Sequence, residues 1–182
     1  MFASVERCYN IAELRKLAER RLPAPMFHYI DGAADDEWTL RRNTRAFDGY
    51  EFQPRCLVDV GKIDLATTVF GERIEWPFFC SPTALSRLFH HEGERAVVRA
   101  AHAAGTFYSL SSFSSLSIEE IAKLSAGPKA FQVYVLKDRG LTREFLQRAR
   151  AAGFKALQLT VDVAVSGNRE RDIVTGDRKS VV

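Results

Sequence analysis

The sequence predicts an α/β fold in which parallel strands alternate with helices. Four apolar stretches begin at Phe78, Thr106, Ala130 and Ala156, with 28, 24 and 26 residues between successive starts. Segments with helical periodicity follow these stretches, and strand-helix repeats of this kind form parallel sheets. Each stretch also carries or leads into polar residues. Because polar ends and loops converge at the carboxyl edge of a parallel sheet, we expect the active site there.

Composition favours a soluble globular protein, with 46% apolar and 27% charged residues. The 26 basic residues are scattered among 23 acidic ones, which argues against nucleic acid as a partner. Cys8, Cys56 and Cys80 lack the spacing of a disulfide framework or a metal site. No apolar run approaches the roughly 20 residues that span a bilayer, and Glu6 and Arg7 interrupt any signal-like start, so we expect a cytoplasmic protein.

A helical extension is predicted before the repeats. A capping-box-like start at Asn10 predicts a helix that ends at Pro23. The segment Pro25 to Asp36 is expected to be an aromatic-rich turn region. Residues 37–46 are expected to form a helix, and residues 50–76 a connecting region with a hairpin.

Two aromatic residues of the turn region have more than one interpretation. Tyr29 precedes an Asp-Gly corner, so its ring could project into a site or could pack against neighbours, and packing is favoured by roughly two to one because aromatic residues are mostly core. His28 is interpreted as an interior, hydrogen-bonded histidine.

The exit of the first strand is a rigid turn. Pro82 fixes the backbone, and the small neighbours Ser81, Thr83 and Ala84 allow a flat ligand to approach closely. Cys80 is expected to pack as a small apolar residue in the strand.

Three helices are predicted between the strands. They cover residues 92–104, 118–124 and 143–152, and Gly105 and Gly153 are expected to end the first and the third.

Polar residues recur at the strand ends. Gln132 and Tyr134 alternate with apolar neighbours, so both should point to the inner face, where a ligand or water would satisfy them. Thr160 and Asp162 repeat this two-residue spacing. Ser111 ends the second stretch, although serine-rich loops are common and this signal alone is weak.

The charged segment 168–172 also has two interpretations. The guanidinium of Arg169 could bind a carboxylate bidentately above the strands. A surface salt-bridge cluster is the favoured interpretation from the charge pattern alone.

These stretches together resemble a known family. The blocks that carry the resemblance are Phe27 to Gly32, Trp38 to Leu40 with Asn43, Ser81 to Ala84, Glu92 to Glu94, Leu110 to Ser112, Phe131 to Val135 with Lys137 to Arg139, Ala152 to Phe154, and Thr160 to Asp162. From about Tyr9 to Asp172 the chain resembles the FMN-dependent 2-hydroxy-acid dehydrogenases and oxidases, a family that includes glycolate oxidase, L-lactate dehydrogenase and mandelate dehydrogenase.

The resemblance implies a (β/α)8 TIM barrel with FMN across its carboxyl-end mouth. Residues 1–76 would be N-terminal helices and a connecting region, residues 77–172 about the first four βα units, and residues 173–182 a divergent polar tail rather than a fourth helix.

The resemblance also assigns roles to individual residues. Contacts to FMN are expected from the backbone of Pro82, Thr83 and Ala84 and from the side chains of Ser111, Gln132 and Thr160. Tyr29 and Arg169 would bind the substrate carboxylate, and Tyr134 would hydrogen-bond the substrate. Asp162 would orient a catalytic histidine.

The implied reaction oxidises a lactate-like L-2-hydroxy acid to a 2-oxo acid. The electron acceptor is left open among oxygen, a cytochrome and a quinone. A homo-oligomer is expected if the full-length barrel is made. Some relatives lie on the inner membrane surface, so a peripheral position there is a second expectation.

The chain supplies only about half of a barrel whose usual length is about 250 residues. The resemblance places the histidine base in the second half, and none of the four histidines here lies at the exit of a predicted strand. We therefore expect a truncated chain that is inactive alone. The alternative is a non-catalytic remnant or interaction module of the same fold that binds no flavin.

Overall fold

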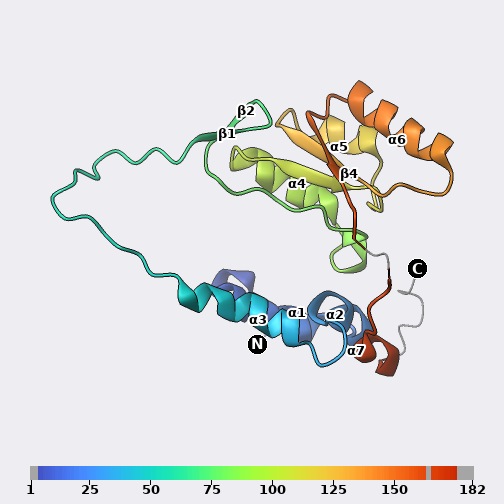
Figure 1. Ribbon diagram of the computed structural model, residues 1–182, viewed down its shortest axis with the longest axis horizontal. Helices are drawn as coiled ribbons and strands as arrows, with labels where there is room; N and C mark the ends of the chain where they lie inside the picture. Colours follow the sequence, from blue (N-terminus) through green and yellow to red (C-terminus); the bar gives the residue numbers. More distant parts are fainter. Residues whose placement is uncertain (1–3, 163–164, 176–182) are drawn as a thin grey trace. The chain divides into compact units, whose positions relative to one another are not determined.

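The computed structural model describes residues 4–162 and 165–175 of the chain. The chain forms two compact units (Figure 1). Met1–Leu57 and Val163–Val182 make up the first, here called the helical unit, and Val58–Asp162 the second, called the sheet unit. The division into residues 1–76, 77–172 and 173–182 stays a prediction, and residues 176–182 lie outside the described part.

The sheet unit is built on three parallel strands in the order β3-β4-β5. They are β3 (Tyr108–Ser111), β4 (Lys129–Val133) and β5 (Ala156–Leu159), so the last three of the four predicted stretches form strands. The first stretch contributes a single parallel bridge between Cys80 and Tyr108. Pro77 has no backbone N–H to donate, and the N–H of Phe78 bonds Trp76, which shortens this stretch.

One face of this sheet packs against three helices, α4 (Glu94–Ala103), α5 (Ile118–Leu124) and α6 (Arg139–Ala151). Alternation sends every second strand residue to this face. The buried cluster there is apolar: Val98, Ala101, Tyr108, Leu110, Leu116, Ile118, Ile121, Phe131, Val133 and Ala149. Cys80 is half-buried against the same cluster, as expected for a small apolar residue.

The three helices confirm the predicted segments, with the starts of α4 and α6 shifted; α4 begins at Glu94, two residues later than predicted. α5 begins with a full capping box between Ser117 and Glu120. α6 begins at Arg139 rather than at residue 143, because the side chain of Asp138 accepts hydrogen bonds from the first helical N–H groups. Gly105 and Gly153 follow α4 and α6 with positive φ angles, as predicted.

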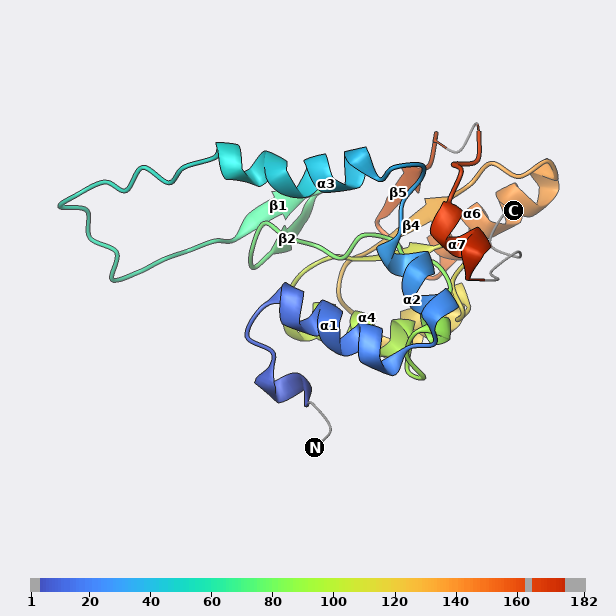
Figure 2. The ribbon, with the colours of Figure 1, turned by 90° about the horizontal axis from the view of Figure 1, so that it is seen from below.

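The opposite face of the sheet is closed at its amino end by the predicted hairpin. β1 (Thr67–Val69) pairs antiparallel with β2 (Glu72–Ile74) (Figure 2). Ile74 packs with Phe107 and Ala130 in a second buried apolar cluster. This face is called the inner face below. Its amino end is therefore filled by apolar side chains. A short 3₁₀ helix, η3 (Ser86–Leu88), lies in the loop before α4.

The helical unit contains α1 (Ile11–Arg21), α2 (Ala24–Asp31), α3 (Trp38–Arg45) and α7 (Glu170–Val174), with 3₁₀ helices η1 (Val5–Arg7) and η2 (Ala46–Gly49). α1 has the predicted start, because Asn10 Oδ1 accepts a hydrogen bond from the Glu13 N–H at 2.9 Å. α3 confirms the helix expected within residues 37–46.

Two predictions in this unit are wrong. Residues 24–31 form α2 rather than a turn region, because Pro25 occupies the first helical turn, where its missing N–H costs no helical hydrogen bond. Ile173 and Val174 belong to α7 rather than to a polar tail, because Arg169 and Arg171 bind this segment to α2.

Within residues 4–162 and 165–175, no helix is long and apolar enough to cross a membrane.

Candidate active site

Three predicted cofactor contacts meet at the carboxyl end of the inner face. Ser111 and Gln132 lie side by side in the register of β3 and β4. Gln132 is 4% exposed, and its Oε1 accepts hydrogen bonds from the Ser111 hydroxyl at 3.0 Å and the Ser112 N–H at 3.2 Å. Its Nε2 donates to the hydroxyl of Thr160 at 2.5 Å. One amide therefore joins the tips of three successive strands into a continuous polar row.

The inner face changes from apolar to polar along the strands. At its amino end Phe107, Ala130 and Ala156 pack in the apolar cluster. Further along lie Ser109 and Gln158, and both carry a buried oxygen without a hydrogen-bond partner among the described residues. Such orphaned groups are costly and indicate a place where a ligand or water binds.

Tyr134 and Asp162 follow the ends of β4 and β5 by one and three residues. Tyr134 is half-buried, and its ring lies 5.2 Å from that of Phe113, centroid to centroid. Asp162 is exposed. Tyr134 comes two residues after Gln132, and Asp162 comes two residues after Thr160. This is the spacing of residues on one face of a strand.

The turn expected to approach a flat ligand lies beside the β3 loop. Pro82 and Ala84 are half-buried and Thr83 is exposed. The backbone N–H of Leu85, the next residue, donates to the carbonyl of Phe113 at 3.1 Å. The turn is thus tied to the loop that carries Ser111.

Tyr29 and Arg169 lie together in the helical unit. Arg169 places its guanidinium over the ring of Tyr29, and its Nη2 donates to the Tyr29 carbonyl. Its Nε donates to Asp172 Oδ2 at 2.5 Å, and Asp172 is 2% exposed. The Tyr29 ring therefore packs, as favoured, and Arg169 is in a salt bridge, as the charge pattern indicated.

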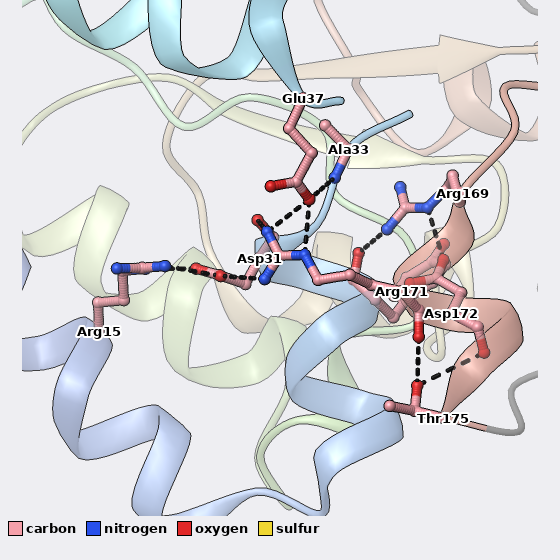
Figure 3. A network of polar contacts seen from close by, with 9 residues as sticks. Arg15, Asp31, Ala33, Glu37, Arg169, Arg171, Asp172 and Thr175 are labelled. Atoms are coloured by element: carbon pink, nitrogen blue, oxygen red, sulfur yellow. Dashed lines mark hydrogen bonds and ion pairs between the residues drawn. The ribbon is translucent and has the colours of Figure 1, made fainter. Parts of the chain in front are cut away.

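A wider ion-pair network holds segment 168–175 on α2 (Figure 3). Arg171 bonds both Asp31 Oδ2 at 3.1 Å and Glu37 Oε1 at 2.6 Å, and Arg15 bonds Asp31 from the other side. The hydrogen bonds from Arg15 hold the pKa of Asp31 below its usual value, with burial opposing them and Arg171 adding to them. The hydrogen bond from Ala33, followed by that from Arg171, lowers the pKa of Glu37.

His28 differs from its prediction. It is half-buried in α2, but its Nδ1 has no hydrogen-bond partner among the described residues. The ring instead meets that of Phe27 edge to face, with centroids 6.1 Å apart.

Comparison with known proteins identifies the family. The sequence model of the FMN-dependent dehydrogenases matches residues 18–180, beyond Asp172, where the resemblance was expected to fade. The chain belongs to the FMN-dependent dehydrogenase family. FMN is the cofactor of this family, as the resemblance implied.

Relatives and solved structures agree with this assignment. Glycolate oxidase 5 from Oryza sativa subsp. japonica is 46% identical over 164 residues, which cover 90% of the chain and 44% of that relative. A lactate oxidase from Pediococcus acidilactici has a TM-score of 0.88 and 38% identity, covering 92% of the chain and 47% of that structure. A soluble mutant of the membrane-associated (S)-mandelate dehydrogenase from Pseudomonas putida also has a TM-score of 0.88, with 38% identity over 92% of the chain and 48% of that structure. The chain thus spans about half of each relative, which fits a partial TIM barrel.

The carboxyl end of the inner face has unused hydrogen-bond donors. Gln132 Nε2 carries two N–H groups, and its described bond to Thr160 uses one of them. Thr160 accepts that bond, so its hydroxyl proton is available to donate. Ser109 Oγ and Gln158 Oε1, on the same face, have no hydrogen-bond partner among the described residues; the hydroxyl can donate or accept, whereas the amide oxygen can only accept.

Sequence reasoning missed two buried carboxylates. Asp172 holds Arg169, and Glu94, which is 1% exposed, accepts hydrogen bonds from two loops. Acidic residues are usually exposed, so neither stood out as a buried residue. The available signal for Glu94 was its place in a family block, Glu92 to Glu94.

Proposed function

We propose that this chain supplies the flavin-ring face and part of the substrate site of an enzyme that oxidises L-2-hydroxy acids to 2-oxo acids. The observation that carries the proposal is the row of Ser111, Gln132 and Thr160, joined through one buried amide at three strand ends. Bound FMN would supply the acceptor for the two electrons removed from the substrate.

The residues of this chain would then contact either the cofactor or the substrate. On the cofactor side, the backbone of Pro82, Thr83 and Ala84 would contact the ring, and the polar row would hydrogen-bond its edge. On the substrate side, the contact between Arg169 and Tyr29 supports the proposal, because it brings together within the helical unit the two residues proposed to bind the substrate carboxylate. The guanidinium N–H groups that Asp172 and the Tyr29 carbonyl leave unused would bind that carboxylate.

Tyr134 and Asp162 would act nearer the reacting carbon. The hydroxyl of Tyr134 would donate a hydrogen bond to the substrate oxygen, and Asp162 would orient a histidine that takes the substrate proton. The histidines of this chain lie elsewhere: His28 in α2, His102 in α4, and His90 and His91 in the loop before α4. The 182 residues alone are therefore proposed to bind FMN without turning over substrate.

A titration of the purified chain with FMN tests the proposal. We expect saturable quenching of flavin fluorescence and a shifted visible spectrum. Gln132→Leu removes the linking amide, and Thr160→Val removes one hydroxyl at nearly constant volume; each should weaken binding about tenfold, since 1.4 kcal/mol corresponds to a factor of ten. Gln147→Leu, on the exposed side of α6, is the matched control and should bind like the wild type.

The same experiment separates the second candidate, a non-catalytic module of this fold. One observation favours that candidate: residues of the polar row already hydrogen-bond one another without a ligand. Gln132 Oε1 accepts hydrogen bonds from Ser111 and Ser112. Absence of saturable FMN binding, with circular dichroism confirming a folded chain, would favour it. Anaerobic reduction of bound flavin by L-lactate would contradict the proposed lack of turnover.

A further inference from the structure

A buried carboxylate joins the first two loops at the carboxyl end of the sheet. Glu94 is the first residue of α4 and is 1% exposed. Its Oε1 accepts hydrogen bonds from the Ser86 N–H at 3.2 Å and the Ser115 N–H at 2.9 Å. Ser86 follows the Pro82–Ala84 turn, and Ser115 follows the Ser111–Ser112 strand end. One side chain therefore links both segments that are proposed to contact FMN.

Two further contacts join the same loops. The Leu85 N–H donates to the Phe113 carbonyl at 3.1 Å, and the Arg87 N–H donates to the Ser115 hydroxyl at 3.3 Å. Leu85 itself has a φ of 52°, a left-handed conformation that is unfavourable for a non-glycine residue. The turn is therefore held in a conformation that its own backbone disfavours.

The neighbouring glycine allows this close approach. Gly93 has a φ of 50°, and a Cβ atom there would lie 2.5 Å from Arg87 Cγ and 3.0 Å from the Arg87 backbone nitrogen. A side chain at this position would push α4 away from the loop that contains Ser86. The sequence Gly93-Glu94 thus combines a close backbone contact with a carboxylate aimed at both loops.

Both printed hydrogen bonds to this carboxylate are accepted by Oε1, while Oε2 is buried without a hydrogen-bond partner among the described residues. Burial alone would raise the pKa of Glu94, but hydrogen bonds from Ser115, from its own backbone N–H and from Ser86 hold that pKa below its usual value. Hydrogen bonds to an ionised acceptor are roughly twice as strong as neutral ones.

We propose that Glu94 is a positioning residue that fixes the Pro82–Ala84 turn and the Ser111–Ser112 strand end at the spacing the flavin ring requires. This inference rests on the proposed function for its consequence on FMN binding. The link between the two loops is a property of the chain itself and is measurable without FMN.

The test compares Glu94→Gln, Glu94→Ala and a control, Glu92→Gln. Glu92 lies in the same block, and its side chain is 43% exposed, beside Arg99. Hydrogen exchange of the Ser86 and Ser115 amides is measured first, without FMN. We expect exchange to accelerate about tenfold or more in Glu94→Ala, less in Glu94→Gln, which keeps an acceptor oxygen, and not at all in the control.

FMN titration of the same variants gives the second result. The affinity for FMN should be highest in the wild type and the control, lower in Glu94→Gln and lowest in Glu94→Ala. The melting temperature is recorded for each variant, and if Glu94→Ala does not fold, Glu94→Gln carries the comparison.

The outcomes separate the two proposals. Unchanged exchange at Ser86 and Ser115 overturns the loop link, and a lower melting temperature with unchanged FMN affinity shows that Glu94 is merely structural. If the wild type binds no FMN, the proposed function fails together with the role of Glu94 towards FMN, while the exchange data still decide whether Glu94 joins the loops.

Discussion

The guanidinium of Arg169 lies over the aromatic ring of Tyr29, with its Cζ atom 5.2 Å from the ring centroid. The two residues are 140 positions apart in the sequence, yet the Arg169 side chain also bonds the Tyr29 carbonyl. Both were expected to bind a substrate carboxylate. In the structure they contact each other within the helical unit, and Arg169 is also paired with Asp172.

Asp172 should be necessary for this arrangement. It is 2% exposed and accepts a hydrogen bond from Arg169 Nε at 2.5 Å. We expect Asp172→Ala to destabilise the helical unit by about 1–3 kcal/mol, the usual effect of removing a hydrogen bond to a charged group. Urea denaturation measures the change, and Asp36→Ala, at an exposed acidic position, is the control. Equal midpoints for the two variants would contradict the role of Asp172.

Stability should depend on pH through Asp31. Hydrogen bonds from Arg15 lower the folded-state pKa of this carboxyl, so its contribution is present above the unfolded value of about 4 and is lost as the pH falls through the folded-state pKa. Asp31→Asn removes this contribution. We therefore expect wild type to exceed the variant in urea midpoint at about pH 7 and the difference to shrink towards about pH 3. A difference that grows in acid would show that the sign is wrong.

Cys80 should react slowly with thiol reagents. It is half-buried against the helix-covered face, and burial raises the pKa of its thiol, so little thiolate is present at neutral pH. Cys56 is exposed. In a labelling time course followed by peptide mass spectrometry, Cys56 should be modified first, and Cys56→Ser should remove the fast phase. Equally fast labelling of Cys80 would mean that residues 78–80 do not pack as described.

Gly93→Ala should cost more stability than Gly153→Ala. Both glycines have positive φ, and Gly93 combines its φ of 50° with a ψ of −130°, outside the left-handed region that other residues can adopt. At Gly93 the new Cβ would also collide with Arg87, whereas nothing lies within 4 Å of that position at Gly153. Thermal unfolding of the two variants measures the combined effect of the backbone conformation and the contact, and equal losses would argue against it.

Local patterns were sufficient to predict most of the sheet unit. Alternation placed Gln132 on the inner face, and the strand register puts it beside Ser111. The capping box at Ser117 and the glycine at position 105 bounded their helices because these are local hydrogen-bonding and backbone effects.

Long-range contacts account for what local patterns missed. α7 is held by Arg171 binding Asp31 and Glu37, which lie more than 130 residues earlier in the chain. Glu94 is buried because two distant loops supply its donors. No periodicity or spacing within a segment encodes such partners.

Chemical-shift mapping of the isotope-labelled chain during FMN titration tests the central claim most directly. We expect the largest perturbations at the backbone of residues 82–84, at Ser111 and Thr160, and at the side-chain amide of Gln132. Helices α4, α5 and α6 should change little on their exposed sides. Perturbations concentrated on those helices, or none at saturating FMN, would contradict the assignment of the inner face as the flavin site.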